Sequence, residues 1–165
     1  MLKMLEAANW APSHGDTEPW RFQVFMDDGR LRLAEAYAEA YRQMSGEDFD
    51  AAKCKANYDR ALSAPVWISI GMLPKLGLDG TPIHSEEEEV LAVGCAVQNM
   101  HLMASALGLA GMWHSKGISV CEPVRRWLGL ESPGRLMGFF FCGYPKVAWP
   151  DGERGPLREK VVWHG

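Results

Sequence analysis

The stretch SEEEEVLAVGCAVQNMHLMASALGLAGMWHS, residues 85–115, joins four glutamates to an almost unbroken apolar run of helix-forming residues. Ser85 suits an N-cap position, and the glutamates suit the positive end of a helix dipole. Gly108 and Gly111 are typical stop signals. We therefore predict a helix over residues 86–107, about 33 Å long at about 1.5 Å per residue.

Hardly any face of this helix would be left for water. Its apolar positions form several stripes: Val90, Val93, Val97 and Ala104 make one, and Leu91, Cys95, Leu102 and Ala106 make others. A helix that is apolar nearly all round either spans a membrane or lies buried inside a larger assembly. Its length would suit a bilayer, but Gln98, Asn99 and His101 lie in its middle, so we exclude a membrane span. We expect a second subunit to cover the helix.

The composition predicts one soluble domain over residues 1–165. The chain is 47% hydrophobic and 23% charged, which is ordinary for a globular protein. A net charge of -4 with no basic run gives no support for nucleic-acid binding. The four cysteines form no Cys-x-x-Cys pair, so we expect reduced, mostly buried thiols in a cytoplasmic protein. The N-terminus lacks the pattern of a signal peptide.

The rest of the chain mixes helices and strands without a regular βαβ alternation, which predicts an α+β fold. We expect helices over 1–9, 33–44, 49–62 and 122–128, and strands over 20–26, 30–33, 66–73 and 136–142. Residues 27–29 would form a turn between two of these strands. Residues 74–85 read as a loop, and the tail after residue 143 reads as an extended arm with at most a short helix near 157–162.

Common catalytic motifs are missing. There is no Gly-x-Ser-x-Gly elbow, phosphate loop or Rossmann fingerprint. The five histidines show no metal-ligand spacing, so we expect no metal site. Two candidate loops remain, residues 10–20 and 111–117, and each gathers aromatic, imidazole, hydroxyl and charged groups. That mixture suits a flat heteroaromatic ligand with polar edges.

An ordered set of motifs resembles the FMN-dependent nitroreductase family, closest to its small, minimal members. The set is Ala-Pro-Ser-His-x-x-x-x-Pro-Trp-Arg-Phe, Ala-Pro before a buried strand, Gly-Cys-Ala-Val-Gln-Asn-x-x-Leu-x-Ala-x-x-Leu-Gly-Leu-x-x-x-Trp, and Phe-x-Cys-Gly-Tyr-Pro. It runs in order from about Leu5 to Trp163, which is nearly the whole chain.

The resemblance implies a three-layer fold, with a mainly antiparallel sheet flanked by helices and the long helix buried at a homodimer interface. It implies an FMN at each of two interface sites and an arm over residues 143–165 that reaches the partner. NADH or NADPH would hand a hydride to flavin N5 and leave, and a nitroaromatic, quinone or similar small-molecule acceptor would follow in a ping-pong cycle. The protein would supply no catalytic residue of its own, because the redox chemistry belongs to the cofactor.

The resemblance also implies positions for the cofactors. Trp10 and His14 match residues that contact the partner's flavin, and Glu18 matches a Gln or Asn at the ring edge. Residues 113–115 match the segment along the isoalloxazine, namely Trp113, His114 and Ser115. A stretch associated with the nicotinamide cofactor matches Ala104, Ser105, Ala106, Leu107, Gly108 and Leu109. Arg154 matches a residue that binds the FMN phosphate. Without the resemblance, Trp113 would read as core, His14 as a turn residue and Arg154 as an ordinary surface arginine.

Two departures leave alternatives open. Family members begin with an Arg-Arg-Ser-x-Arg segment that holds the FMN phosphate, and this sequence starts after that point, so either the true start lies upstream or an anchor is missing. Losing charge-assisted contacts of about 1.5–3 kcal/mol each would weaken FMN binding by orders of magnitude. Glu18 would place a carboxylate near the flavin edge, where it would disfavour the anionic reduced flavin. A non-catalytic or weakly flavin-binding dimer is therefore the alternative, and a flavin-fragmenting or dehalogenating activity is a third possibility, since acceptor choice depends on loops.

Overall fold

The computed structural model describes residues 1–148 and 152–165, and its centre is a four-stranded antiparallel sheet in the order β1-β2-β4-β3. The strands are β1 (Trp20–Met26), β2 (Val66–Met72), β3 (Ala110–His114) and β4 (Arg135–Gly143). The two central strands, β2 and β4, are buried along nearly their whole length, as their continuous apolar sequences predict. The other two, β1 and β3, lie at opposite edges of the sheet.

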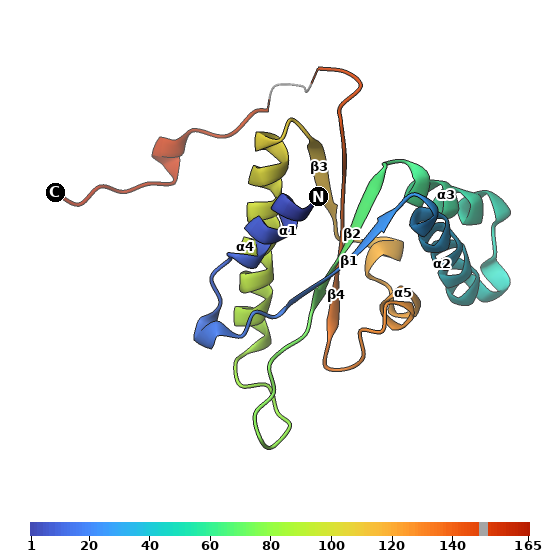
Figure 1. Ribbon diagram of the computed structural model, residues 1–165, viewed down its shortest axis with the longest axis horizontal. Coiled ribbons are helices and arrows are strands. Elements are labelled where there is room, and N and C mark those ends of the chain that lie inside the picture. Colours follow the sequence, from blue (N-terminus) through green and yellow to red (C-terminus); the bar gives the residue numbers. More distant parts are fainter. Residues whose placement is uncertain (149–151) are drawn as a thin grey trace.

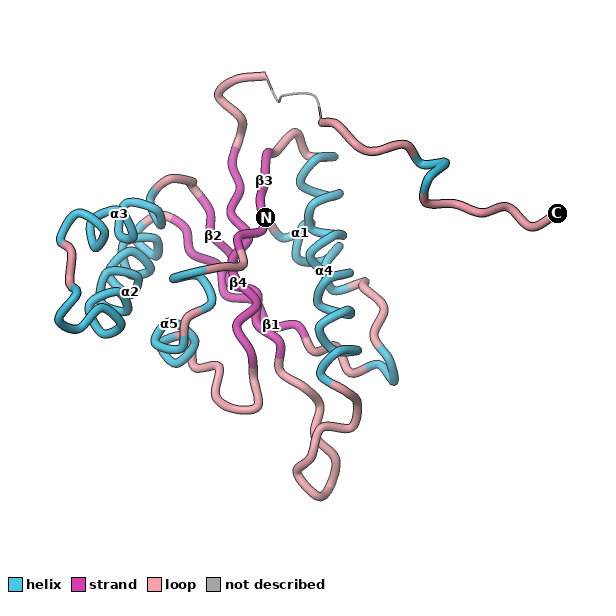
Figure 2. The backbone as a smooth tube through the Cα atoms, turned by 180° about the vertical axis from the view of Figure 1, so that it is seen from behind, coloured by secondary structure: helices cyan, strands magenta, loops and turns pink. Residues whose placement is uncertain are grey.

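Helices cover both faces of the sheet, so the molecule has three layers (Figures 1 and 2). One face carries α1 (Leu2–Asn9) and α4 (Glu86–Ala106), and the other carries α2 (Asp28–Ser45), α3 (Ala51–Leu62) and α5 (Glu122–Trp127). Each face has its own apolar core, one centred on Ile68, Val97 and Phe140 and the other on Trp67 and Phe139. The predicted α+β fold with a flanked antiparallel sheet is confirmed.

The long helix α4 begins and ends as its sequence predicts. Ser85 and Glu88 form a reciprocal capping box, which satisfies backbone donors of the first turn. The stripe containing Val93, Val97 and Ala104 is buried by the chain itself. The opposite stripe stays open, with Leu91 69% and Leu102 60% exposed and Cys95 exposed between them. One chain therefore buries only one side of this apolar helix.

The structure contradicts three local predictions. Residues 27–33 form no hairpin, because α2 starts at Asp28 and strand β1 pairs with β2 instead. The helix-forming sequence that follows overrides the turn-like Asp-Asp-Gly, and Asp27 makes the sharp break with a φ of 46°. Residues 110–114 form the edge strand β3 rather than a loop. The helix expected over residues 1–9 would have Leu2, Leu5 and Ala8 or Asn9 on its inner side, but in α1 the buried residues are Met4 and Ala8, and Leu2 is 69% exposed.

All four cysteines are free, and Cys54, Cys121 and Cys142 are buried, as predicted. Burial raises the pKa of the Cys121 and Cys142 thiols, which makes them poor nucleophiles. Among the described residues, no helix has both the length and the apolar character needed to cross a membrane.

The C-terminal segment leaves the sheet after β4 and extends away from the three layers (Figure 1). It contains one short 3-10 turn, η4 (Leu157–Glu159), where the sequence predicted at most a short helix. Its apolar side chains are uncovered, with Val162 78% and Trp163 88% exposed. The described part of this segment is therefore largely exposed.

Candidate functional site

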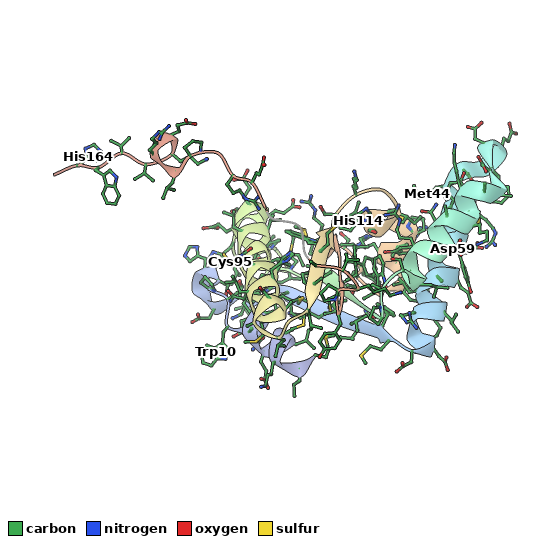
Figure 3. The ribbon with its side chains drawn as sticks, turned by 90° about the horizontal axis from the view of Figure 1, so that it is seen from above. Trp10, Met44, Asp59, Cys95, His114 and His164 are labelled. Atoms are coloured by element: carbon green, nitrogen blue, oxygen red, sulfur yellow. The ribbon has the colours of Figure 1, made fainter. Side chains whose placement is uncertain are left out.

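The predicted ligand residues fall into two groups at opposite edges of the sheet. Trp10, His14 and Glu18 precede the edge strand β1, whereas Trp113 and His114 belong to the edge strand β3. Figure 3 shows Trp10 and His114 well apart. A single chain does not bring the two groups together into one pocket.

Strand β3 pairs with β4 on one side only, so its outer backbone edge has no strand partner among the described residues. Trp113 packs against the core beneath α4, and its indole Nε1 donates a 2.9 Å hydrogen bond to the Met137 carbonyl. A cavity of about 500 Å³ opens beside this residue. Its lining includes Trp113, Ser115, Arg125, Arg135 and Met137.

His114 points to the opposite face of the sheet, because side chains alternate along a strand. Its Nδ1 lies 2.8 Å from the Ser119 hydroxyl, and its Nε2 lies 3.4 Å from Nη1 of Arg60 at the end of α3. A guanidinium can only donate, so Nε2 accepts and Nδ1 carries the proton that is donated to Ser119. Ser119 Oγ also lies 3.1 Å from the buried hydroxyl of Tyr37.

Burial and the neighbouring charges of Arg60 and Lys116 lower the pKa of His114 below its ordinary value. The imidazole therefore stays neutral at neutral pH, which agrees with its accepting a hydrogen bond from Arg60. Burial raises the pKa of the Tyr37 hydroxyl, which stays protonated. The chain thus holds a hydrogen-bonded polar network behind β3, in which His114 is neutral and Tyr37 is protonated.

Gly138 allows the backbone at the end of β3 to lie directly on β4. Its φ is +114°, and a Cβ atom there would stand 2.3 Å from the carbonyl oxygen of His114. Any other residue would push the segment containing His114 and Ser115 away from the sheet. The position of this candidate ligand-binding segment therefore depends on a glycine in the neighbouring strand.

The second group lies around α1 and the start of β1. Trp10 is 85% exposed, and with Glu18, Leu5 and Arg21 it borders an open groove of about 500 Å³. Glu18 has a φ of 45°, and its backbone N–H donates to the Ser13 hydroxyl. Its carboxylate is exposed and takes part in no salt bridge found in the described part of the chain.

His14 does not join Trp10 in this groove. Its Nδ1 donates to Glu88 Oε1 at 2.8 Å, and its ring stacks on that of His84 with centroids 4.0 Å apart. The three residues each offer a ligand atom within 4.8 Å of the others. Sequence spacing alone gave no sign of this cluster, since His14 and Glu88 are 74 positions apart.

The stretch 104–109 forms the end of α4 and the turn into β3. Ala104 is buried, whereas Ser105, Gly108 and Leu109 line a cavity of about 380 Å³ together with His101. Ala106 is exposed and Leu107 is half-buried. Arg154 is exposed in the arm, and its Nη1 donates to the carbonyl of Glu153 next to it. Arg154 does not line the cavity beside Trp113.

Sequence reasoning missed Arg60 and Ser119. Arg60 looked like an ordinary helix residue, and Ser119 lies in the short 3-10 turn η3 (Gly117–Val120), which has no recognisable motif. Their positions were the one available signal. Arg60 lies near the end of the predicted helix 49–62, and Ser119 lies shortly before the predicted helix 122–128.

Comparison with known proteins agrees with this fold. The model of the nitroreductase family matches residues 1–144, so the chain belongs to that family. A Bacillus subtilis (strain 168) protein named "Putative NAD(P)H nitroreductase YfhC" is 29% identical over 163 residues, which make up 98% of this chain and 81% of that protein.

Two solved structures extend the comparison. A nitroreductase-like family protein from Bacillus cereus has a TM-score of 0.79 and 27% identity, over 98% of this chain and 81% of that one. The FMN-dependent nitroreductase NfnB from Mycobacterium smegmatis, solved in complex with NADPH, has a TM-score of 0.69 and 20% identity, over 98% of this chain and 86% of that one. The second likeness shows a shared fold.

Proposed function

We propose that this protein is an FMN-dependent oxidoreductase that uses NADH or NADPH to reduce nitroaromatic, quinone or similar small acceptors in a ping-pong cycle. Its family membership and the names of its relatives support the cofactor and the electron donor. The observation that carries the proposal is the free edge of β3. Three consecutive residues there offer an indole (Trp113), an imidazole paired with a guanidinium (His114 with Arg60) and a hydroxyl (Ser115).

These residues fit a flavin. The cavity beside Trp113 has a volume of about 500 Å³, within the roughly 300–1,000 Å³ range of ligand pockets. The unpaired N–H and C=O groups of β3 can hydrogen-bond the polar edge of a heteroaromatic ring. Arg60 adds a fixed positive charge behind His114, and such a charge stabilises an anionic ring system.

A homodimer would complete the site. Trp10 and Glu18 lie at the far edge of the sheet from β3, so they can approach the same flavin only if they come from another copy of the chain. The open stripe of α4 and the uncovered apolar residues of the arm provide surfaces for that copy. We propose that α4 lies at the centre of the dimer and that the arm places Arg154 on the partner's FMN phosphate.

The bound FMN would supply the hydride and electron transfer. The chain's own residues bind and orient it. Ser115 and the backbone of β3 would hold the ring, and Ser119 would fix the tautomer of His114 so that Arg60 keeps its position. The turn at 104–109, with its adjacent cavity, would bind the nicotinamide donor.

A visible absorption spectrum of the purified protein tests this proposal, recorded before and after adding FMN and dialysing. We expect a retained flavin band and NADH- or NADPH-dependent reduction of nitro or quinone compounds. A protein that retains FMN but oxidises neither donor with any such acceptor would be a flavin-binding dimer without this activity. A protein that gives up added FMN would support the weakly binding alternative.

A variant of Arg60 tests where the flavin binds. We expect Arg60→Gln to raise the dissociation constant for FMN by about tenfold or more, because it removes the positive charge behind His114, and a charged interaction contributes about 1.5–3 kcal/mol. Arg42→Gln is the matched control, because Arg42 is exposed on the neighbouring α2 and pairs with Glu39 on the same helix. Fluorescence titration with FMN measures both. Equal affinities for the two variants would place the flavin elsewhere.

A further inference from the structure

Glu89 is the one acidic or basic side chain that the described part of the chain buries completely, with 1% of its surface exposed. It lies in the first turn of α4, where its neighbours Glu86 and Glu87 are exposed. Its Oε2 accepts a 2.8 Å hydrogen bond from the Thr17 hydroxyl. Its Oε1 has no hydrogen-bond partner, and the carboxyl group joins no salt bridge, among the described residues.

Burying such a group is unfavourable. A carboxyl group in an apolar interior loses its water, and one hydrogen bond replaces only part of that hydration. The residues that follow it on α4, Ala92 and Val93, belong to the apolar core. An apolar side chain of similar size would cost less at this position. The carboxyl group of Glu89 therefore points to a role other than packing, and its contact with Thr17 indicates which one.

Thr17 belongs to a loop, residues 13–18, whose backbone has an unusual conformation. Gly15, Asp16 and Glu18 have positive φ angles of 60°, 51° and 45°. Residues other than glycine seldom adopt such angles, and they keep them where surrounding contacts hold the backbone in place. Asp16 and Glu18 are two of the three non-glycine residues with a positive φ in the described part of the chain. This loop therefore depends on contacts with the rest of the molecule.

The hydrogen bond between Thr17 and Glu89 is such a contact. It joins residues 72 positions apart, and Thr17 is only 8% exposed, so water competes little with it. The side chain of His14 also reaches α4, at Glu88, but that contact is exposed to water. Thr17 directly precedes Glu18, which borders the groove at the start of β1. The buried bond thus fixes the backbone next to Glu18.

We propose that Glu89 is a positioning residue of the flavin site: through Thr17, it holds Glu18 where its carboxylate faces the edge of the partner subunit's flavin. This inference rests on the proposed function, which brings Glu18 to that flavin from another copy of the chain. A carboxylate at the ring edge opposes the addition of negative charge to the flavin. The buried hydrogen bond therefore keeps the midpoint potential of the bound FMN low, although Glu89 itself touches no cofactor.

Thr17→Val combined with Glu89→Met removes the hydrogen bond with little change of shape. Because both buried polar groups are replaced together, neither is left without its partner, and the fold should be retained or stabilised. Glu89→Gln keeps an oxygen that can accept from Thr17 and should behave like the parent. Glu87→Met is the matched control, since Glu87 is exposed on the same helix turn. Thermal unfolding followed by circular dichroism checks the fold of each variant.

The first measurement needs no flavin. Hydrogen exchange of the full-length protein, followed by mass spectrometry, reports how often the backbone of residues 13–18 opens. We expect exchange there to be faster in the double variant than in the parent by about fivefold or more, since the net contribution of one hydrogen bond corresponds to such a factor. Glu89→Gln and Glu87→Met should exchange as the parent does.

The second measurement is the midpoint potential of FMN bound to the full-length protein. Glu18→Gln should raise this potential in the parent, because it removes a negative charge. In the double variant the potential should already be higher, and adding Glu18→Gln should produce less than about half of the shift seen in the parent. A Glu89 that only stabilised the fold would leave the two shifts equal.

The proposal is overturned if residues 13–18 exchange equally in the parent and in the folded double variant, or if Glu18→Gln shifts the potential equally in both or not at all. Thr17→Val alone, which leaves α4 unchanged, provides the same comparisons should the double variant not fold. Failure of the proposed function is distinguishable from these results. A parent that does not retain FMN, but whose loop exchange responds to the double variant, has a held loop without a flavin site, and that result overturns the flavin role of Glu89 as well.

Discussion

Ser119 is the residue on which the polar network behind β3 depends. It is fully buried, and its one hydroxyl contacts both His114 Nδ1 and the hydroxyl of Tyr37. Tyr37 is fully buried as well and has no other side-chain hydrogen bond among the described residues. A polar group without a partner in such a place is costly, because it has given up its water.

Ser119→Ala should lower the free energy of unfolding by about 1–3 kcal/mol, since it leaves the Tyr37 hydroxyl without a partner. Ser115→Ala provides the control, because Ser115 is exposed four positions earlier and should shift stability by no more than about 0.5 kcal/mol. Urea denaturation followed by fluorescence measures both. Equal stabilities of the two variants would show that the network contributes nothing to folding.

Two histidines make stability depend on pH. Burial lowers the pKa of both His101 and His114 in the folded chain. As the pH falls through about 6.5, the unfolded chain takes up protons at these positions before the folded chain does, so the free energy of unfolding decreases. The contribution is complete above the unfolded pKa and is lost as the pH falls toward the lower folded values.

Unfolding measurements at about pH 7.5 and about pH 5.5 check this dependence. We expect the fall in stability to be smaller in His114→Gln and His101→Gln than in the parent. His164→Gln, at an exposed position, should show the same fall as the parent. A parent whose stability rises toward pH 5.5 would contradict the sign.

At the scale of elements, the contact between β3 and β4 decides where the candidate site lies. Strand β3 pairs with β4 from Ala110 opposite Gly143 to His114 opposite Phe139. The close approach at Gly138 fixes the end of this ladder. The edge of β3 is therefore set by a residue outside β3.

Gly138→Ala should destabilise the protein by at least about 2 kcal/mol, because the positive φ and the 2.3 Å contact with the His114 carbonyl both oppose a Cβ atom. It should also reduce FMN affinity if the flavin lies on β3. Gly80→Ala is the control: its φ is also positive, at +79°, but nothing lies within 4 Å of its Cβ position. Its cost should be only the backbone strain, about 1 kcal/mol. Thermal unfolding compares the two, and equal costs would mean that the close approach is unimportant.

At the scale of the whole molecule, one chain leaves much apolar surface uncovered. The open stripe of α4, the exposed Trp10 and the arm would all remain in water if the protein were a monomer. A stripe of exposed apolar residues such as the one on α4 is typical of an interaction site. The proposed homodimer covers it with a second copy of the same chain.

Leu102→Asp should convert the dimer into monomers, because it places a charge in the middle of the open stripe on α4. Leu78→Asp makes the same change in an exposed loop before α4 and should leave the dimer intact. Size-exclusion chromatography with light scattering gives the mass of each variant. A dimeric Leu102→Asp protein, or a monomeric parent, would show that α4 is not the interface.

Much of the fold could be predicted because it depends on local pattern. The four glutamates and the apolar run specified α4 to within one residue, and the alternating sequence of residues 20–26 specified β1. The errors occurred where a local signal was weaker than its context. Asp-Asp-Gly is typical of a hairpin turn, but the long helix-forming sequence after it makes α2 start at Asp28. Residues 110–114 form a strand because β4 offers them a hydrogen-bonding partner.

The amino-acid sequence by itself determined the helices, the buried strands and the all-round apolar character of α4, because hydrophobic periodicity and end signals act over a few residues. Only the tertiary structure decided that Arg60 lies against His114, 54 positions away, and that His14 and His84 meet at Glu88. It also decided which stripe of α4 faces the core and which stays open. Such contacts depend on how whole elements pack, and no local pattern encodes the separation of two residues that only the folded sheet and helices bring together.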